Sequence, residues 1–266
     1  MSEFKVTRYK LRTQEEGHRG TDDPFSAVFL SDLHNCSYGE GNSALLQEIR
    51  NQSPEAVFVS GDMLTGTVPP ETDAAASLLD ELTKKYPVYY VNGNHEQRMR
   101  QFPDRYEDSY QKYSDTIKSF GVHLLENACE RIEIRRMPIT VWGYELPMEY
   151  YRRTRSAELL PAQLHEALGE PDPASYNLLL THNPMHFSAY AAWGADLTLA
   201  GHLHGGIIRL PFFGGLISPQ MRLFPNYTRG LYQINKKKMI VSAGLGSHTV
   251  SMRINNPPEL VVIDFV

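Results

Sequence analysis

The sequence predicts an α/β fold in which two β-sheets form a sandwich flanked by helices. Five short, continuously apolar runs have the character of strands buried on both faces. Helix-like stretches lie between several of these runs, and this alternation is typical of βαβ units. Since no repeat, low-complexity tract or flexible linker interrupts the pattern, residues 1–266 are predicted to form a single domain.

The expected elements follow in chain order. The five buried strands are expected at 27–30, 56–59, 88–91, 178–180 and 197–200. The helices are expected at 43–50, 72–84, 105–120 and 156–168. Hairpins over 131–145 and 230–243 and a last strand over 260–266 would add antiparallel strands to the core.

Composition narrows the class of protein. The chain is 41% apolar and 21% charged, with a mean hydropathy of −0.39, as in a soluble globular protein. Its net charge of −5 disfavours a specific nucleic-acid partner, so a substrate phosphate has to be attracted by bound cations or clustered arginines. An apolar export segment and a membrane span are not seen, and two cysteines, Cys36 and Cys129, cannot form a disulfide framework. These features favour a cytoplasmic location.

Residues able to bind metal ions follow each of the five apolar runs. The segments are Ser31-Asp32-Leu33-His34, Ser60-Gly61-Asp62, Asn92-Gly93-Asn94-His95-Glu96, Thr181-His182-Asn183 and Gly201-His202-Leu203-His204. Since ligands bind at the carboxyl ends of strands in an α/β sheet, we expect these side chains at one edge of the same sheet. Each segment alone is explained as well by a turn or a packed histidine. Their recurrence after all five strands favours a metal centre.

The number and type of these side chains suit two metal ions. The predicted ligands are Asp32, His34, Asp62, Asn94, His182, His202 and His204. Two carboxylates, four imidazoles and one amide exceed what a single ion takes, and Asp62 is the expected bridge between two ions. Asp32, His34 and His204 are expected on one ion, and Asn94, His182 and His202 on the other. Nitrogen and oxygen ligands without thiolate favour divalent or trivalent Mn, Fe or Zn over Mg²⁺ or Ca²⁺.

His95 is the predicted catalytic residue. It follows Asn94 on an expected tight turn, so it reaches the site without being a ligand. We expect it to donate a proton to the leaving alkoxide or to stabilise the transition state; the alternative is that it only orients a ligand. Glu96 is expected to hold the His95 ring.

In this order, the segments around Asp32, Asp62, Asn94, His182 and His202 resemble the motif blocks of the calcineurin-like metallophosphoesterases. The resemblance implies a four-layer fold, a dinuclear Mn, Fe or Zn centre with the ligands above, and the proton-donor role of His95. Segments 205–211, 230–232, 244–246 and 253–260 resemble a bacterial subgroup of small phosphodiesterases. Some members of that subgroup act at membranes on lipid-linked pyrophosphates.

Three departures from the resemblance matter. The relatives often carry an N-terminal export or anchor segment that is not seen here, and Leu203 stands where the family commonly has Thr. Protein Ser/Thr phosphatases follow Gly-Asp with an Asp-Arg-Gly element, whereas this chain has Met63-Leu64-Thr65-Gly66. Protein phosphatase activity is therefore disfavoured.

The leading functional hypothesis is hydrolysis of phosphodiester or pyrophosphate bonds by attack of a metal-bound hydroxide. The substrate is expected to be a small molecule or a lipid headgroup. The alternatives are a broad phosphomonoesterase and a non-catalytic binding module. Arginines and tyrosines at 98–100 and 150–155 are candidates to hold a second phosphate or a nucleobase, or form a solvated surface. The apolar loop 207–225 is a candidate for peripheral membrane contact or a cap over the second sheet; the sequence specifies no oligomeric state.

Overall fold

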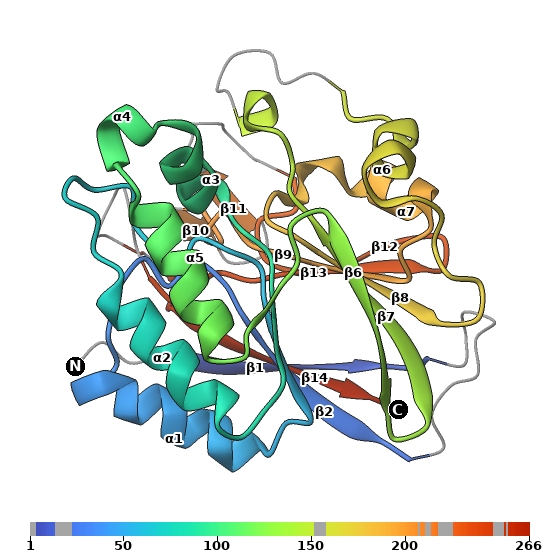
Figure 1. Ribbon diagram of the computed structural model, residues 1–266. Helices are drawn as coiled ribbons and strands as arrows, with labels where there is room; N and C mark the ends of the chain where they lie inside the picture. The colour runs from blue at the N-terminus through green and yellow to red at the C-terminus, as the bar shows by residue number, and fades with distance from the viewer. Residues whose placement is uncertain are drawn as a thin grey trace.

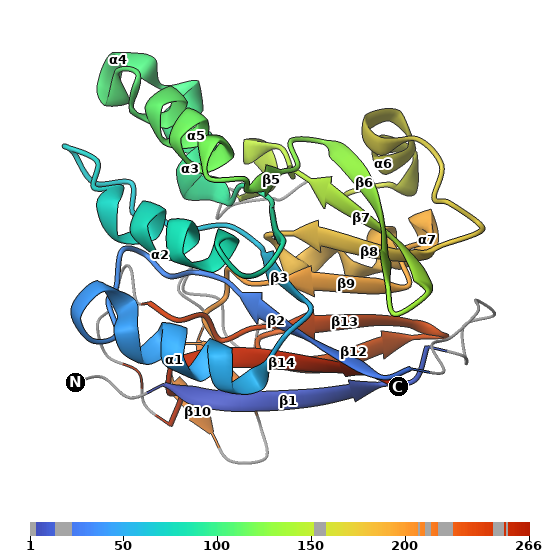
Figure 2. The same ribbon diagram turned by 60° about the horizontal axis from the view of Figure 1, so that its bottom comes forward.

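The computed structural model describes residues 4–13, 23–151, 158–206, 208–210, 214–217, 226–246, 253 and 255–266. Two six-stranded sheets pack face to face (Figures 1 and 2). In spatial order the first contains β1 (Lys5–Leu11), β14 (Glu259–Phe265), β2 (Phe25–Leu30), β3 (Ala56–Val59), β4 (Val88–Tyr90) and β5 (His123–Leu124). The second contains β12 (Gly230–Ile234), β13 (Lys237–Val241), β9 (Leu197–Ala200), β8 (Tyr176–Thr181), β7 (Met137–Tyr144) and β6 (Ala128–Ile134). A separate pair consists of β10 (Ile208–Leu210) and β11 (Gly214–Ile217).

Helices cover the outer face of each sheet, which gives four layers. The first sheet is covered by α1 (Ser43–Gln52), α2 (Asp73–Thr83) and α5 (Ser109–Ser119). The second is covered by α6 (Pro161–Leu168) and α7 (Phe187–Trp193). Two further helices, α3 (Asn94–Gln101) and α4 (Pro103–Tyr106), lie together between β4 and α5 in the chain. The 3-10 helices are η2 (Glu40–Asn42), η3 (Met148–Tyr151) and η4 (Pro184–His186).

The strand β2 shows why the apolar runs are continuous. Its Val28 and Leu30 pack against the outer helices, while Ala27 and Phe29 pack against the second sheet. Successive side chains of a strand point to opposite faces, and here both faces are covered, so residues 27–30 are all apolar. The α/β sandwich with flanking helices and its five buried strands are confirmed.

Several elements differ from the sequence prediction. The helix expected at 105–120 is broken, since α4 ends at Tyr106 and the backbone of Glu107 is left-handed (φ 53°) before α5 begins. The strand β1 and the helices α3 and α7 were not predicted; α3 begins at Asn94, where a tight turn was expected. The helix expected from 156 begins at Pro161, and residues 156–157 lie outside the described residues.

The prediction that all five polar segments lie at one edge of the same sheet is wrong. The strands β2, β3 and β4 belong to the first sheet, whereas β8 and β9 belong to the second. The carboxyl ends of the two groups meet across the sandwich, because His182 after β8 lies 3.8 Å from Asp32 after β2 (Nε2 to Oδ1). The site is therefore built jointly by both sheets. Among the described residues, no helix has the length and apolar character needed to cross a bilayer.

Candidate metal centre

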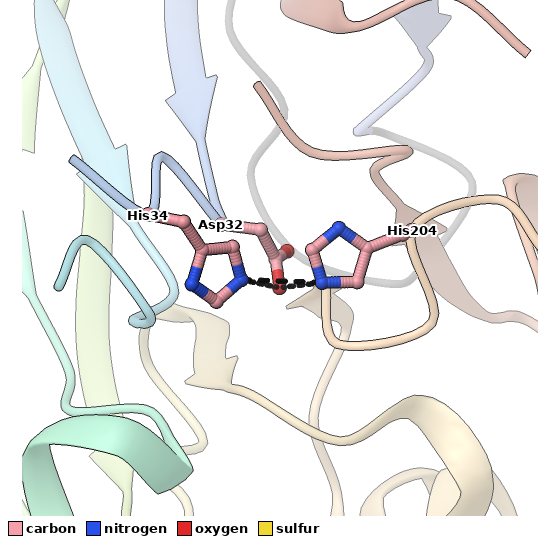
Figure 3. A group of neighbouring side chains, drawn as sticks. All are labelled: Asp32, His34 and His204. Carbon is pink, nitrogen blue, oxygen red and sulfur yellow. Dashed lines mark hydrogen bonds and ion pairs between the residues drawn. The ribbon is translucent and has the colours of Figure 1, made fainter. Parts of the chain in front are cut away.

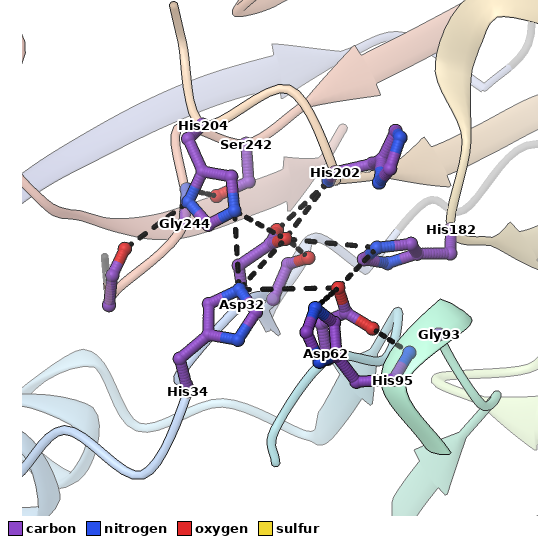
Figure 4. Close-up of polar contacts among 12 residues, drawn as sticks. Asp32, His34, Asp62, Gly93, His95, His182, His202, His204, Ser242 and Gly244 are labelled. Carbon is purple, nitrogen blue, oxygen red and sulfur yellow. Dashed lines mark hydrogen bonds and ion pairs between the residues drawn. The ribbon is translucent and has the colours of Figure 1, made fainter. Parts of the chain in front are cut away.

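The structure brings six of the seven predicted ligands into two groups of candidate ligand atoms. Asp32, His34 and His204 form one group (Figure 3), and Asp62, His182 and His202 form the other (Figure 4). Within each group, one ligand atom from every residue lies within 4.8 Å of the others. The same criterion joins His34, Asp62 and His95, so the two groups are contiguous. The first group has the residues expected on one ion, while the second contains His182 and His202 together with Asp62, the expected bridge, in place of Asn94.

The backbone of these loops is unusual. Five candidate ligands have left-handed backbone angles: Asp32 (φ 52°), His34 (φ 49°), Asp62 (φ 51°), His202 (φ 70°) and His204 (φ 49°). Such a conformation costs about 1–3 kcal/mol at a residue other than glycine and persists only where the surroundings enforce it. Its recurrence at five positions in one cluster indicates that the loops are shaped by the site.

Backbone carbonyl groups orient three of the imidazole rings. The Nδ1 atoms of His34, His182 and His204 lie 3.1, 2.6 and 3.2 Å from the carbonyl oxygens of Leu64, Ser60 and Gly246, respectively. A carbonyl oxygen only accepts hydrogen bonds, so each Nδ1 carries the proton and donates it. In the neutral ring each Nε2 atom is then left with a lone pair, which is the arrangement of a metal-binding histidine.

These lone pairs converge on carboxylates and on one another. The Nε2 atoms of His34 and His204 are 3.2 Å apart, and that of His204 is 3.4 Å from Asp32 Oδ1. Burial lowers the pKa of both rings to about 3, with His204 adding to the effect at His34 and Arg253 at His204. Two unprotonated nitrogens facing each other beside a carboxylate repel unless a cation lies between them, so this group fits a metal ion.

The second group also has the chemistry of a cation site. The Nε2 atom of His182 is buried and lies 3.0 Å from Asp62 Oδ2. Burial by itself lowers the pKa of His182, but the carboxylate of Asp62 outweighs it and raises the pKa to about 9. The position therefore favours a positive charge. Among the residues that the structure describes, none donates a hydrogen bond to the buried amide oxygen Oδ1 of Asn94, as expected of an oxygen ligand.

Asp62 lies between the two groups. Its Oδ2 atom is 3.0 Å from His182 Nε2 and 4.0 Å from His34 Nε2, so one oxygen faces both groups. Its Oδ1 atom accepts the backbone N–H of His95 at 2.9 Å. Burial opposes ionisation of Asp62, yet His182 and His95 hold its pKa well below the usual range. The carboxylate is therefore available as an anion.

His95 has a fixed proton position. Its Nδ1 atom accepts the backbone N–H of Gly66 at 2.7 Å, so in the neutral ring the proton is on Nε2. This Nε2 atom lies 3.8 Å from Asp62 Oδ2, toward the candidate ligands. The carbonyl oxygen of Gly66 in turn accepts the hydroxyl of Tyr106 at 3.1 Å. In the neutral ring, the N–H at Nε2 therefore faces the candidate ligands.

The expected role of Glu96 in holding the His95 ring is wrong. Its buried carboxylate instead accepts hydrogen bonds from four groups, namely the backbone N–H of Asp62, Leu64 and Gly93 at 3.0 Å each and the hydroxyl of Tyr90 at 3.1 Å. Three of these donors are in the loops that carry Asp62 and Asn94. Glu96 therefore fixes the backbone of two loops, and the ring of His95 is held by Gly66.

A sixth loop contributes to the centre without supplying a predicted ligand. It follows β13 and runs over residues 242–246, beside Asp32 in Figure 4. A Cβ atom on Gly244 (φ 71°) would lie 2.7 Å from that of Asp32, so only glycine fits this approach. The carbonyl of Gly246 orients His204. The pair of glycines at 244 and 246 was the sequence signal for this loop.

The basic and aromatic residues near the rim have different roles. Arg100 is held by Glu126 and Glu145 at 2.7 Å each, so it belongs to a structural network. Tyr150 is buried, and the ring of Tyr151 packs edge-on against His202, with centroids 5.0 Å apart. Residues 152–157, with three arginines of the predicted cluster, lie outside the described residues, as does most of the apolar loop 207–225.

Comparison with known proteins identifies the family. A model of the calcineurin-like phosphoesterase family matches residues 25–206. The chain is 26% identical over 270 residues to the phosphodiesterase YaeI of Escherichia coli (strain K12), covering 99% of this chain and 88% of that protein. It is 27% identical over 234 residues to the metallophosphoesterase YkoQ of Bacillus subtilis (strain 168), covering 88% of this chain and 80% of that protein.

A solved structure shows the same fold at low sequence identity. GAP50, the anchor in the inner membrane complex of Plasmodium, superposes with a TM-score of 0.50 at 10% identity, covering 91% of this chain and 81% of that one. The family match, the relatives and the converging ligand atoms agree. The chain therefore belongs to the calcineurin-like phosphoesterase family and is a metal-dependent phosphoester hydrolase.

Proposed function

We propose that this protein hydrolyses phosphodiester or pyrophosphate bonds with a pair of metal ions, each Mn, Fe or Zn. Asp32, His34 and His204 would hold one ion, and Asn94, His182 and His202 the other. Asp62 would touch both. The observation that carries the proposal is the position of Asp62 Oδ2, within 4.0 Å of an Nε2 atom from each group.

When bound, two such ions supply an activated water and neutralise the phosphoryl oxygens as charge develops. The chain itself supplies the remaining parts of the reaction. Carbonyl groups of Leu64, Ser60 and Gly246 keep the imidazoles in the tautomer that binds a metal. His95, with its proton on Nε2, donates to the leaving oxygen, which would otherwise depart as a strong base.

The substrate is proposed to be a diester or pyrophosphate of a small molecule or lipid headgroup. Support comes from the relative named a phosphodiesterase, to which the chain is similar over 99% of its length. A broad phosphomonoesterase is the alternative within the same chemistry.

A substrate comparison tests the proposal. Protein stripped with EDTA is reloaded with Mn²⁺, Fe²⁺ or Zn²⁺ and assayed with bis(p-nitrophenyl) phosphate and p-nitrophenyl phosphate. We expect activity only with metal and a kcat/KM at least about tenfold higher for the diester. A higher value for the monoester supports the alternative. Absence of hydrolysis with every metal contradicts both and leaves a binding module.

A further inference from the structure

Arg253 contacts the loop 242–246 through both terminal nitrogens of its guanidinium group. Its Nη1 atom donates to the carbonyl of Ala243 at 2.8 Å, and its Nη2 atom donates to the carbonyl of Gly246. The Gly246 carbonyl also accepts the Nδ1–H of His204, and this ring nitrogen lies 3.4 Å from Arg253 Nη2. A carbonyl oxygen has two lone pairs, so it can accept both donors. Arg253 therefore holds the carbonyl that sets the direction of the His204 lone pair.

Asn256 holds the backbone of His204 itself. Its Nδ2 atom donates to the carbonyls of His204 at 2.5 Å and Gly206 at 2.7 Å. A Cβ atom on Gly205 (φ 68°) would lie 2.4 Å from Asn256 Oδ1, so only glycine lets the loop approach the amide this closely. Asn256 is 1% exposed, so its hydrogen bonds are shielded from water and costly to lose.

The loop 242–246 also fixes Asp32, another member of the group of candidate ligands drawn in Figure 3. The backbone N–H of Gly246 donates to the carbonyl of Asp32 at 2.6 Å. Gly246 thus donates to Asp32 and accepts from both His204 and Arg253. A shift of this one residue would move two of the three ligands expected on the first ion.

The second group of candidate ligands is held by different residues. His182 is oriented by the carbonyl of Ser60. Asn94 follows Gly93, whose backbone N–H is held by Glu96. The hydrogen bonds of Arg253 and Asn256 described above therefore act on the first group.

We propose that Arg253 and Asn256 are positioning residues that set the affinity of the first metal position, the one expected to be held by Asp32, His34 and His204. The affinity of the second position would depend little on them. The inference rests on the two-ion site of the proposed function and adds which residues outside the ligand set control the occupancy of one position.

Single-site backgrounds test the proposal. His182→Ala leaves the first position complete, and His204→Ala leaves the second complete. Mn²⁺ binding to each background is measured by calorimetric titration, with and without Asn256→Ala, which removes both amide donors without adding a charge. We expect Mn²⁺ binding to weaken about 10–100-fold in the first background and to stay within about threefold in the second. A general loss of stability would weaken both.

Arg253 offers a test in which charge and position predict opposite signs. If its charge alone mattered, Arg253→Ala would strengthen Mn²⁺ binding, because a positive group beside a cation would be gone. If it positions Gly246, Arg253→Ala should weaken Mn²⁺ binding in the His182→Ala background about tenfold. Arg253→Lys keeps the charge but has one ammonium group in place of the planar fork, so it should weaken binding as well. This milder change keeps the test available if Arg253→Ala does not fold.

The matched controls are Asn51→Ala, at an exposed amide of α1, and Arg135→Ala, at an exposed arginine paired with Glu55. Neither should change Mn²⁺ binding in either background, and melting temperatures of the metal-free proteins show that each variant is folded. Equal weakening in both backgrounds, unchanged binding in both, or stronger binding after Arg253→Ala contradicts the inference and leaves the proposed function in place. If the unaltered protein binds fewer than about two ions, the proposed function fails and this inference fails with it.

Discussion

The Nε2 atoms of His34 and His204 lie 3.2 Å apart, and both rings donate their Nδ1 proton to a backbone carbonyl. Neither nitrogen can therefore donate to the other. The arrangement is unfavourable without a cation and favourable with one, which makes the folded chain a preformed metal site. His182 differs, because the carboxylate of Asp62 raises its pKa to about 9, so this position favours a positive charge, carried by a proton on the ring or by a bound cation.

Asp62→Asn should remove metal from both positions. Asparagine keeps the shape and tolerates the left-handed backbone at this residue (φ 51°), but it lacks the negative charge that faces both groups. We expect the content to fall from about two ions per chain to below one, measured by elemental analysis. Asp115→Asn, on the exposed side of α5, is the control and should keep both ions. Loss of a single ion would show that Asp62 is not the bridge.

His95→Ala should separate catalysis from metal binding. Without the Nε2 proton donor, kcat should fall by about 10²–10⁴-fold while the metal content stays near that of the unaltered protein. His123→Ala removes an imidazole that pairs with Glu130 outside the centre, and it should keep full activity. A His95 variant that loses metal instead would assign His95 to ligation.

Glu96→Gln should loosen the two loops that Glu96 ties together. Glutamine places one N–H₂ group where a carboxylate oxygen now accepts two hydrogen bonds, so two buried donors lose their acceptor. At about 1–3 kcal/mol for each of the two donors, the free energy of unfolding should fall by about 2–6 kcal/mol in urea denaturation. Metal affinity should weaken by about 10–100-fold. Glu81→Gln, at an exposed pair with Lys84, should change neither property. An unchanged unfolding free energy for Glu96→Gln would mean that the loops do not depend on this carboxylate.

Gly93→Ala tests how closely the loop of Asn94 approaches Asp62. A Cβ atom at this position would lie 2.2 Å from Asp62 Oδ1 and 2.5 Å from its backbone nitrogen. We expect Asp62 to be displaced and metal affinity, followed by calorimetric titration, to fall at least about tenfold. Gly121→Ala is the control, because it places a side chain on a strained backbone (φ 94°), and no atom of the described residues lies within 4 Å of the added Cβ. It should lower stability by about 1–2 kcal/mol and leave metal affinity unchanged. Unchanged metal affinity in the Gly93 variant would show that the two loops can move apart without weakening metal binding.

The amino-acid sequence by itself determined the buried strands and the candidate ligands, because both are local patterns. A strand covered on both faces is apolar at every position, and a polar residue directly after it marks the strand end. That pattern was sufficient to place Asp32, Asp62, His182 and His202 at strand ends before their neighbours were known. It failed for α3, whose Glu96 and Gln97 are buried polar residues that give no helical apolar stripe.

Only the tertiary structure decided how those ligands act. The sequence could not divide the five strands between two sheets, since pairing depends on contacts between distant segments. The carbonyl groups that fix the tautomers of His34, His204 and His182 lie 30, 42 and 122 residues away from them. Backbone carbonyls are present at every residue, so no sequence signal distinguishes these three. The sequence thus specifies which residues can bind a metal ion, while the direction of each lone pair depends on the folded backbone around it.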